Sequence, residues 1–356
     1  MNLEKLLGVV GNMRWTEWVA YGTLIFAANE ALKVVRLLLS DADLQVCAAL
    51  RNMPRKGAFE GKICWITGAS SGIGEALAYE LSRHGAILVL SARRESELRR
   101  VAETCRSVGA KDVEIIPLDV LDFPTHKAAV ERVISRFGRI DYLVNNAGRS
   151  QRGLIENTEI AVDRAVMELN LFGTISLTKA VLPQFLAQPT GGVFVNTSSV
   201  AGKLGTPCGG IYAASKHAVQ GYFDSLRMEL ADRRVRVVNI CPGPVESQIG
   251  SQAFSEAAGA VNNHSESDGT RRVSAERCAA LMAAAMKAEL PEAWIAPQPI
   301  LLFTHVAQYF RGAYFRLGCV VGPRRVAAFR GGRSGYASVQ NLWSVAGDAL
   351  GAKKAQ

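Results

Sequence analysis

Two residues whose types suit acid–base chemistry, Tyr212 and Lys216, lie four positions apart in the segment Ile211-Tyr212-Ala213-Ala214-Ser215-Lys216. At this spacing both side chains lie on the same face of a helix, one turn apart. A free tyrosine hydroxyl has a pKa of about 10, which is too high for efficient proton transfer at neutral pH, and a neighbouring ammonium lowers that pKa. The pair could therefore deliver a proton to a substrate, although the same spacing also occurs by chance on solvated helix faces.

Further polar side chains precede this pair and could act with it. An apolar run ends in Thr197-Ser198-Ser199, and a serine hydroxyl there could donate to a substrate carbonyl beside Tyr212. Two serines at the end of a strand are also a common turn signal. Asn170 interrupts the apolar pattern of a helical run over residues 161–186, where an amide is either satisfied in the core or functional.

Short apolar runs alternate with amphipathic, helix-like segments from residue 62 onward. Such alternation predicts an α/β protein with a Rossmann-type, doubly wound parallel sheet and helices on both faces, in a single domain over residues 58–300. The runs expected to be strands cover residues 63–66, 86–90, 113–118, 140–144, 192–196, 235–240 and 294–295.

A glycine-rich turn follows the first apolar run and precedes a helical pattern that starts at Glu75. Its glycines allow the backbone to turn sharply and to approach a pyrophosphate at the helix N-terminus, where N–H groups and the helix dipole favour an anion. The spacing is Gly-x-x-x-Gly-x-Gly, and a turn without a ligand is the alternative interpretation. The residues expected to hold a dinucleotide here are Thr67, Gly68, Ser70, Ser71, Gly72, Ile73 and Gly74.

The second apolar run ends in Leu90-Ser91-Ala92-Arg93-Arg94, with no acidic residue before Glu95. Dinucleotide folds that select NAD place an acid near this point for the ribose 2′-OH, whereas an arginine suits a 2′-phosphate. Arg93 therefore predicts NADP(H) as the cofactor. The alternative is that these arginines only begin a solvated helix.

Other residues at the ends of the predicted strands could complete the cofactor site. Asp119 could accept a hydrogen bond from the adenine amino group. The quartet Asn145-Asn146-Ala147-Gly148 follows the fourth run, although its asparagines could instead brace the sheet. The sixth run leads into a rigid turn over residues 241–247 that could face a nicotinamide. The contacts expected from all these stretches are Asp119, Val120, Asn145, Ala147, Gly148, Tyr212, Lys216, Pro242, Gly243, Val245 and Ser247.

These motifs, in this order over residues 67–243, resemble the short-chain dehydrogenase/reductase family. The resemblance implies that Tyr212 is the general acid of a reduction and that Lys216 lowers its pKa and holds the nicotinamide ribose. It implies that Ser199, rather than Ser198, polarises the carbonyl and that Asn170 supports a water-linked proton relay. One departure is Ser247, where many members have threonine, and a hydroxyl is kept there.

Longer stretches at residues 88–94, 137–148, 173–183, 214–218 and 239–245 are similar to one branch of this family. That likeness implies a membrane-bound, NADPH-dependent carbonyl reductase of the endoplasmic reticulum that acts on lipophilic aldehydes or ketones of steroid, retinoid or xenobiotic type. Two alternatives stay open: an NAD(P)-dependent retinol or hydroxysteroid dehydrogenase working in the oxidative direction, and a non-catalytic NADP-binding scaffold.

Residues 1–57 are expected to form a membrane-associated segment. Residues 18–39 are mostly apolar and long enough to cross a bilayer. Four polar residues recur in this stretch at three- and four-residue steps, so they share one stripe of a helix: Asn29, Glu30, Lys33 and Arg36. The pattern suits an interfacial helix as well as a spanning one, and a helix packed on the protein's own core is the alternative.

Residues 301–356 are expected to form an amphipathic C-terminal extension. Residues 300–321 are apolar and aromatic, and Arg311 and Arg316 interrupt them, which is typical of contact with a membrane surface. A wall of the substrate pocket or the interface of a homodimer is the alternative. The residues that follow are expected to be a loose tail, and residues 250–272, which lack periodicity, a mobile loop over the substrate.

The composition bounds the possible functions. The 356 residues are 49% hydrophobic and carry a net charge of +9, which allows a sizeable core and excludes global disorder. The basic excess lies near the chain ends, and because no nucleic-acid motif is present, we expect a membrane surface and a lipophilic small molecule rather than nucleic acid as partners. The seven cysteines are scattered without a Cys-x-x-Cys pair, so we expect reduced thiols and no metal site.

Overall fold

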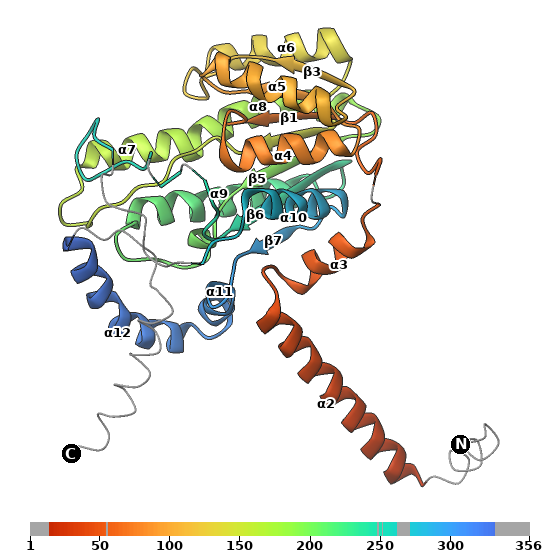
Figure 1. Ribbon diagram of the computed structural model, residues 1–356, viewed down its shortest axis with the longest axis vertical. Helices are drawn as coiled ribbons and strands as arrows, with labels where there is room; N and C mark the ends of the chain where they lie inside the picture. The colour runs from red at the N-terminus through yellow and green to blue at the C-terminus, as the bar shows by residue number, and fades with distance from the viewer. Residues whose placement is uncertain (1–13, 55, 248, 251, 262–270, 332–356) are drawn as a thin grey trace.

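The computed structural model describes residues 14–54, 56–247, 249–250, 252–261 and 271–331. Its centre is a seven-stranded parallel sheet with strand order β3-β2-β1-β4-β5-β6-β7 (Figure 1). The order reverses between β1 and β4, where open α/β sheets bind their ligands. The strands are β1 (Ile63–Thr67), β2 (Ile87–Ser91), β3 (Asp112–Ile115), β4 (Tyr142–Asn145), β5 (Gly192–Thr197), β6 (Val235–Pro242) and β7 (Glu292–Ile295).

Helices cover both faces of the sheet, which confirms the doubly wound fold. Along β1, Cys64 and Ile66 face one layer while Ile63 and Trp65 face the other, as the twofold alternation of a strand requires. One layer contains α4 (Gly72–Arg83), α5 (Glu95–Val108) and α10 (Ala275–Lys287). The other contains α6 (Thr125–Phe137), α7 (Ile160–Met167), α8 (Gly173–Ala187) and α9 (Gly210–Glu229).

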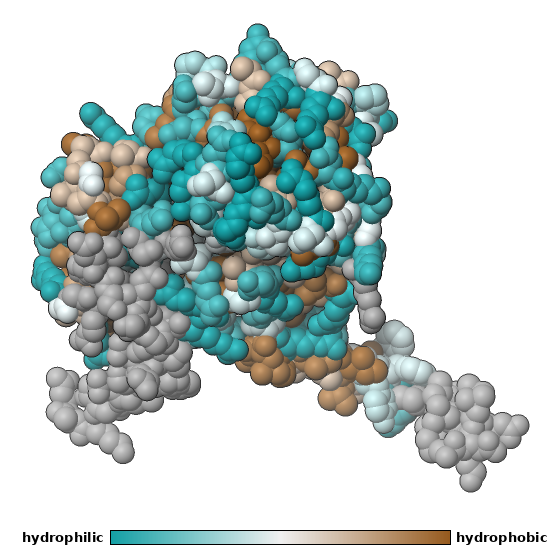
Figure 2. Space-filling model, turned by 45° about the horizontal axis from the view of Figure 1, so that its top comes forward, coloured by the Kyte–Doolittle hydropathy of each residue, from teal (hydrophilic) through white to brown (hydrophobic). Residues whose placement is uncertain are grey.

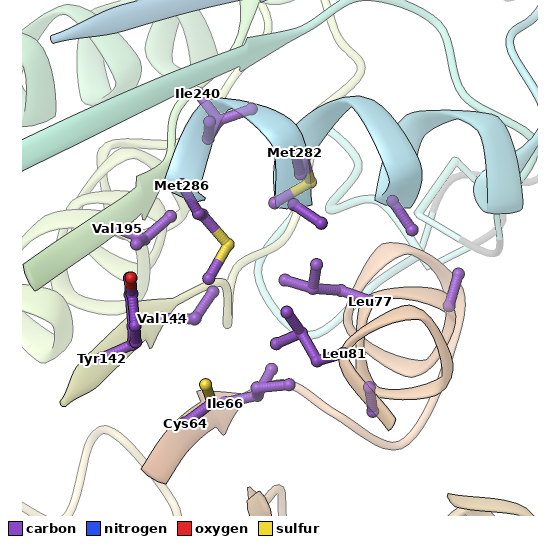
Figure 3. Close-up of a cluster of buried hydrophobic side chains, with 14 of the residues drawn as sticks. Cys64, Ile66, Leu77, Leu81, Tyr142, Val144, Val195, Ile240, Met282 and Met286 are labelled. Atoms are coloured by element: carbon purple, nitrogen blue, oxygen red, sulfur yellow. The ribbon is translucent and has the colours of Figure 1, made fainter. Parts of the chain in front are cut away.

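The first of these layers holds a dense apolar core. Figure 3 shows Leu77 and Leu81 of α4 facing Met282 and Met286 of α10 above the strands. All four side chains are fully buried, and burying one such side chain contributes roughly 1.5–3 kcal/mol. This packing holds α4, and with it the glycine-rich turn at its start, rigidly on the sheet.

The N-terminal boundary differs from the one expected at residue 57. Helix α3 (Leu44–Asn52) packs on the domain, with Val46 fully buried, and Ala42 bridges to Ile295 of the edge strand β7. The Arg277 guanidinium donates to both carboxylate oxygens of Asp41 at 2.9 Å. The chain therefore joins the α/β domain at about residue 40, where α2 ends.

Helix α2 (Trp15–Leu39) projects from the domain (Figure 1). None of its residues is buried, and Leu24, Ile25 and Phe26 are 64%, 68% and 66% exposed. At its base, the Gln298 Nε2 donates to the Leu37 carbonyl at 2.8 Å. Figure 2 shows apolar surface along this arm, in contrast to the largely hydrophilic surface of the domain in the same view. The sequence left open that this helix packs on the protein's own core. The structure does not bury α2 in that way.

One helix in the described part of the chain has the length and composition to cross a membrane, the continuous run Ile160–Ala187. This run comprises α7, α8 and the turn between them, and it covers the sheet, with Leu177, Val181 and Phe185 in the core. Its apolar character therefore has a structural reason within the domain.

The C-terminal segment forms two helices, α11 (Ile300–Tyr309) and α12 (Arg311–Arg330). Helix α12 lies along the loop that precedes α9. The Tyr314 hydroxyl connects the two by donating to the Gly205 carbonyl. At its far end Arg330 pairs with Glu156 at 2.7 Å. Tyr309 and Phe310 are 70% and 66% exposed at the bend between the two helices. The expected tail over residues 332–356 lies outside the described residues.

Candidate active site

The first two turns of α9 place Tyr212 and Lys216 at the carboxyl edge of the sheet. The Lys216 Nζ donates to the Thr197 carbonyl at the end of β5 at 2.8 Å and lies 5.9 Å from the centre of the Tyr212 ring. Both side chains are buried, at 6% and 8% exposure. Burial lowers the pKa of Lys216 to about 8, because a desolvated ammonium loses its proton more readily.

The two serines after β5 have different surroundings. The Ser199 hydroxyl accepts from the Ala201 N–H at 3.1 Å and donates to the Pro242 carbonyl at 3.3 Å, so it lies between β5 and the turn after β6. The Ser198 hydroxyl donates to the Lys216 carbonyl at 3.2 Å and thereby fastens α9 to the strand end. Of the two serines, Ser199 is therefore the one whose hydroxyl bonds to the turn that contains Pro242 and Gly243.

Asn170 lies in a π-helical turn, η1 (Glu168–Phe172), between α7 and α8. Its amide holds the backbone of Arg149, accepting from the N–H and donating to the carbonyl, both at 3.0 Å, and it also donates to the Ser215 hydroxyl at 3.1 Å. A Cβ atom on Gly148 would lie 3.0 Å from the Asn170 Oδ1 and 3.7 Å from the Lys216 Nζ. Asn170 therefore links the loop after β4 to α9 from behind the cleft, at the kind of bulge that often marks functional sites.

The glycine-rich turn between β1 and α4 is closely packed. Gly68 has φ +66° and Gly72 φ +60°, a backbone conformation that favours glycine, and a Cβ on Gly74 would lie 2.4 Å from the Gly68 carbonyl oxygen. The Thr67 hydroxyl accepts from the N–H groups of Asn146 and Ala147 at 3.0 and 3.1 Å and ties the turn to the loop after β4. A dinucleotide fits here, because the backbone leaves room for a pyrophosphate at the start of α4.

These elements enclose one cleft of about 270 Å³. Most of the residues predicted for the site line it: Thr67, Gly68, Ser70, Ser71, Gly72, Ile73, Arg93, Asp119, Val120, Ala147, Gly148, Ser199, Tyr212, Lys216, Pro242, Gly243, Val245 and Ser247. These residues are spread over positions 67–247 of the sequence, and the fold brings them together in one cleft.

Three predicted residues do not line the cleft: Gly74, Asn145 and Asn170. The Asn145 amide donates to the Thr178 hydroxyl at 2.9 Å and to the Asn196 Oδ1 at 3.0 Å, so it braces the sheet instead of facing a cofactor. Its neighbour Asn146 lines the cleft and donates to the Thr67 carbonyl at 3.1 Å. Strand alternation separates the two asparagines.

Several arginines that also line the cleft had no place in the predicted site. Arg94 donates to the Ser70 hydroxyl at 3.1 Å, which puts a second guanidinium beside the glycine-rich turn. Arg149 stacks over the Phe254 ring at 4.0 Å and donates to the Gln252 carbonyl at 2.7 Å. Burial and the charge of Arg93 lower the pKa of Arg149. Arg152 and Arg272 line the cleft as well. In the sequence, the indication for these arginines is only their position directly after a motif or a predicted loop.

A protein-family model described as "short chain dehydrogenase" matches residues 62–258. The chain is 41% identical over 307 residues to human "Dehydrogenase/reductase SDR family member 7", an alignment that covers 85% of this chain and 90% of that protein. It is 42% identical over 190 residues to "11-beta-hydroxysteroid dehydrogenase 1A" of Arabidopsis thaliana, covering 53% and 54% of the two chains.

Solved structures of similar fold were crystallised with either nucleotide. An alcohol dehydrogenase from the archaeon Thermococcus sibiricus, complexed with 5-hydroxy-NADP, is 28% identical with a TM-score of 0.57 over 67% of this chain and 97% of its own. A short-chain dehydrogenase/reductase from Burkholderia phymatum in complex with NAD is 29% identical with a TM-score of 0.61, over 71% and 96%. The fold therefore accommodates a nicotinamide dinucleotide, and the choice between NAD and NADP depends on individual side chains.

Proposed function

The chain belongs to the short-chain dehydrogenase/reductase family, and on that premise we propose that it is an NADPH-dependent carbonyl reductase of lipophilic aldehydes or ketones. Members of this family are oxidoreductases. The observation that carries the proposal is the convergence of Tyr212, Ser199 and Lys216 in one cleft with the glycine-rich turn.

In the proposed reaction the chain's own residues manage the proton and the carbonyl. Ser199 turns its hydroxyl hydrogen from the Pro242 carbonyl to the carbonyl oxygen of the substrate, and Tyr212 donates to the same oxygen. Tyr212 gives up its proton as that oxygen gains negative charge. The Lys216 ammonium stabilises the resulting phenolate, and its bond to the Thr197 carbonyl fixes it there. The nicotinamide nucleotide, when bound, supplies the hydride.

The preference for NADPH rests on charge at the end of β2. Arg93 and Arg94 both line the cleft there, and Arg94 reaches Ser70 in the glycine-rich turn. Glu95, the first acid after this strand, pairs with Arg99 in the helix that follows. A 2′-phosphate would thus meet guanidinium groups, while a ribose 2′-OH would find no carboxylate at this position.

The lipophilic substrate class rests on the apolar part of the cleft and on the relatives. Leu169, Val200 and Ile249 contribute apolar surface to the cleft wall, and relatives that are 42% identical over 190 residues are named 11-beta-hydroxysteroid dehydrogenases. Membrane association belongs to the same proposal, since α2 exposes apolar side chains along its length. The endoplasmic reticulum is the compartment we propose, on the family resemblance.

Replacement of the proton donor tests the proposal. With NADPH and a panel of aromatic and steroid ketones, Tyr212→Phe should lower turnover by about 100-fold or more, since general-acid catalysis typically contributes that much. NADPH affinity, measured by quenching of tryptophan fluorescence, should change by less than about threefold because only the hydroxyl is lost. Tyr222→Phe is the matched control on the same helix, as Tyr222 does not line the cleft. Turnover near the wild-type rate in Tyr212→Phe would refute the mechanism.

A further inference from the structure

Arg149, which follows the Asn-Asn-Ala-Gly quartet after β4, has a side chain that two contacts hold in place. Its Nε donates to the Gln252 carbonyl at 2.7 Å, and its guanidinium lies over the Phe254 ring, 4.0 Å from the ring centre. The backbone of Phe254 is fixed to the loop after β4, because its N–H donates to the Ser150 carbonyl and its carbonyl accepts from the Arg152 N–H, both at 2.9 Å. The guanidinium of Arg149 is therefore held at one place in the wall of the cleft.

The outer nitrogens of this guanidinium are left for a ligand. An arginine carries five N–H groups, and the one on Nε is used by Gln252. Within the described chain, neither Nη nitrogen of Arg149 donates a hydrogen bond, and no carboxylate forms an ion pair with it. Arg149 is half-buried, and the loss of part of its hydration is costly unless an anion replaces the lost water.

A second guanidinium lies near that of Arg149. Arg93, which follows β2, lines the cleft together with Arg149, and the two arginines also line an adjoining hollow of about 480 Å³. Burial and the charge of Arg93 lower the pKa of Arg149, so the two cations are close enough to repel each other. The other residues that line the hollow are apolar apart from Glu168: Leu121, Phe123, Ala165, Leu169 and Phe254.

The acids of this region do not neutralise the two arginines. Glu168 lines the hollow with an exposed side chain, and Asp119 lines the cleft and accepts a hydrogen bond from a backbone N–H at 3.0 Å. Among the described residues, neither acid forms an ion pair with Arg93 or Arg149, and the charge that acts on Arg149 is that of Arg93. The pair therefore keeps its net positive charge.

The positions of the two arginines in the fold suit a nucleotide phosphate. They follow β2 and β4, the two strands that flank β1 in the sheet. The glycine-rich turn at the end of β1 lies between these strand ends, so a dinucleotide bound there is flanked by both arginine-bearing segments. The unused Nη groups of Arg149 form the planar pair of donors that binds a phosphate in a bidentate manner.

We propose that Arg149 binds the adenosine 2′-phosphate of NADP(H) together with Arg93. Two like charges that are held close together are unfavourable in the empty cleft and become favourable when a doubly charged phosphate binds to both. Selection of NADPH over NADH would then depend on the loop after β4 as well as on the end of β2. This inference rests on the proposed NADPH preference and names a further residue that determines it.

A pair of ligands that differ only in the 2′-phosphate tests the inference without turnover. The ligands are adenosine 2′,5′-bisphosphate and adenosine 5′-monophosphate, titrated calorimetrically into the full-length protein in detergent. The wild type should bind the bisphosphate more tightly by about tenfold or more, as a hydrogen bond between charged groups provides. A higher salt concentration should reduce this preference.

Arg149→Met should weaken the bisphosphate by about tenfold and change the affinity for the monophosphate by less than about threefold. Methionine keeps an apolar stem over Phe254, and Arg149→Lys, which keeps the charge, should retain part of the preference. Arg149→Gln keeps an N–H donor for the Gln252 carbonyl without the charge, and it provides the same comparison if the methionine variant does not fold. Titration with NADPH and NADH should give the same pattern.

Arg164→Met is the matched control. This exposed arginine of α7 lines neither the cleft nor the adjoining hollow, and its loss changes the net charge by the same amount. The control variant should keep the full preference for the bisphosphate. An equal loss of preference in Arg164→Met and Arg149→Met would overturn the inference, because it would show an effect of net charge alone.

The outcomes separate this inference from the proposed function. A wild type without preference for the bisphosphate would refute the NADPH assignment and the inference with it. A wild-type preference that persists in Arg149→Met, or equal weakening of both ligands by that variant, would overturn the role of Arg149 alone. A protein that shows the expected preference but reduces no carbonyl would support the role of Arg149 and refute the reductase proposal.

Discussion

The side chain of Lys216 is buried at the point where its charge is needed, and this has a consequence for the pH dependence of the enzyme. Burial places its pKa at about 8, so the ammonium is present below that pH and lost above it. We expect kcat/KM for carbonyl reduction to fall as the pH rises through about 8, because a neutral lysine no longer stabilises the phenolate that forms when Tyr212 gives up its proton.

A pH profile with Lys216→Arg as the comparison checks this expectation. Arginine keeps its charge over the whole range, so the variant should be slower throughout and its falling limb should lie at higher pH. A wild-type profile that stays level through this region, or a limb at the same pH in both proteins, would contradict the assignment.

Arg93 gives the second expectation for a single residue. Arg93→Ala should weaken NADPH binding by about tenfold or more while NADH binding changes little, since a hydrogen bond to a charged group contributes about 1.5–3 kcal/mol. Fluorescence titration with both nucleotides measures the two dissociation constants. Arg99→Ala, which removes an arginine that is paired with Glu95 and lies outside the cleft, should leave both unchanged. Equal weakening of both nucleotides by Arg93→Ala would remove the basis for the NADPH assignment.

At this scale, sequence reasoning located the positions better than the roles of polar residues. The sequence assigns Asn145 rather than Asn146 to the cofactor site, whereas in the structure Asn145 braces the sheet and Asn146 lines the cleft. Both asparagines belong to the same strand end, and only the direction of each side chain distinguishes them. The water-linked relay expected of Asn170 stays a prediction, and the structure adds that its amide contacts Arg149 and Ser215. Such contacts join residues far apart in the sequence, so no local pattern indicates them.

Among the secondary-structure elements, the turn from β1 to α4 has the strictest backbone requirement. Gly68→Ala would force a positive φ on alanine and place its Cβ 3.0 Å from the Ala147 Cα, which should cost about 1–3 kcal/mol of stability. The variant should also lose the rise in melting temperature that NADPH produces in the wild type.

Gly221→Ala supplies the contrasting case in α9. Apart from its chain neighbours and the backbone of its own helix, no described atom lies within 4 Å of the added Cβ. Because alanine is also the better helix former, this variant should gain roughly 0.5–1 kcal/mol with unchanged turnover. Thermal melting with and without NADPH measures both variants. A Gly68→Ala protein as stable as the wild type and still stabilised by NADPH would argue against a phosphate site in this turn.

The strands were predictable because parallel strands buried on both faces appear as continuous apolar runs, and all seven expected runs became strands. Helix α3 was assigned to the membrane segment instead, because its partners are remote. Asp41 bonds Arg277, 236 positions away, and Asp43 accepts from the Trp294 N–H at 2.7 Å, 251 positions away. Sequence patterns show only local periodicity, so contacts between residues this far apart in the chain cannot be recognised from them.

On the scale of the whole molecule, the apolar surface that the domain does not use is concentrated in its terminal helices. Helix α2 has 25 residues, which at 1.5 Å per residue gives a length of about 37 Å. Its composition does not qualify it as a membrane span, so the apolar side chains that it exposes suit contact with a membrane surface. Its Glu30 and Lys33 pair with each other at 2.6 Å, which reduces the cost of placing them in an apolar setting. The exposed rings of Tyr309 and Phe310 provide a second apolar site on α11 and α12.

Two N-terminal truncations would separate anchoring from folding. Deletion of residues 1–39 removes a helix without buried residues, so the shortened protein should keep its melting temperature and its turnover of water-soluble ketones within about twofold. If α2 is the anchor, the protein should move from the pellet to the supernatant on carbonate extraction of membranes. Retention in the pellet would instead assign the membrane contact to α11 and α12.

The matched deletion of residues 1–53 also removes α3, the fully buried Ala42 and Val46, and the Asp41–Arg277 ion pair. The deletion thus removes two core side chains, the Asp41 partner of Arg277 and the Asp43 partner of the Trp294 N–H. These losses should lower the free energy of unfolding by several kcal/mol, roughly 3–5 by comparison with large core truncations. We therefore expect this shorter protein to melt well below the first truncation or to fail to fold. Equal melting temperatures for the two truncations would show that the domain begins at residue 57 after all. A large drop confined to the second would establish α3 as part of the catalytic domain and α2 alone as its projecting arm.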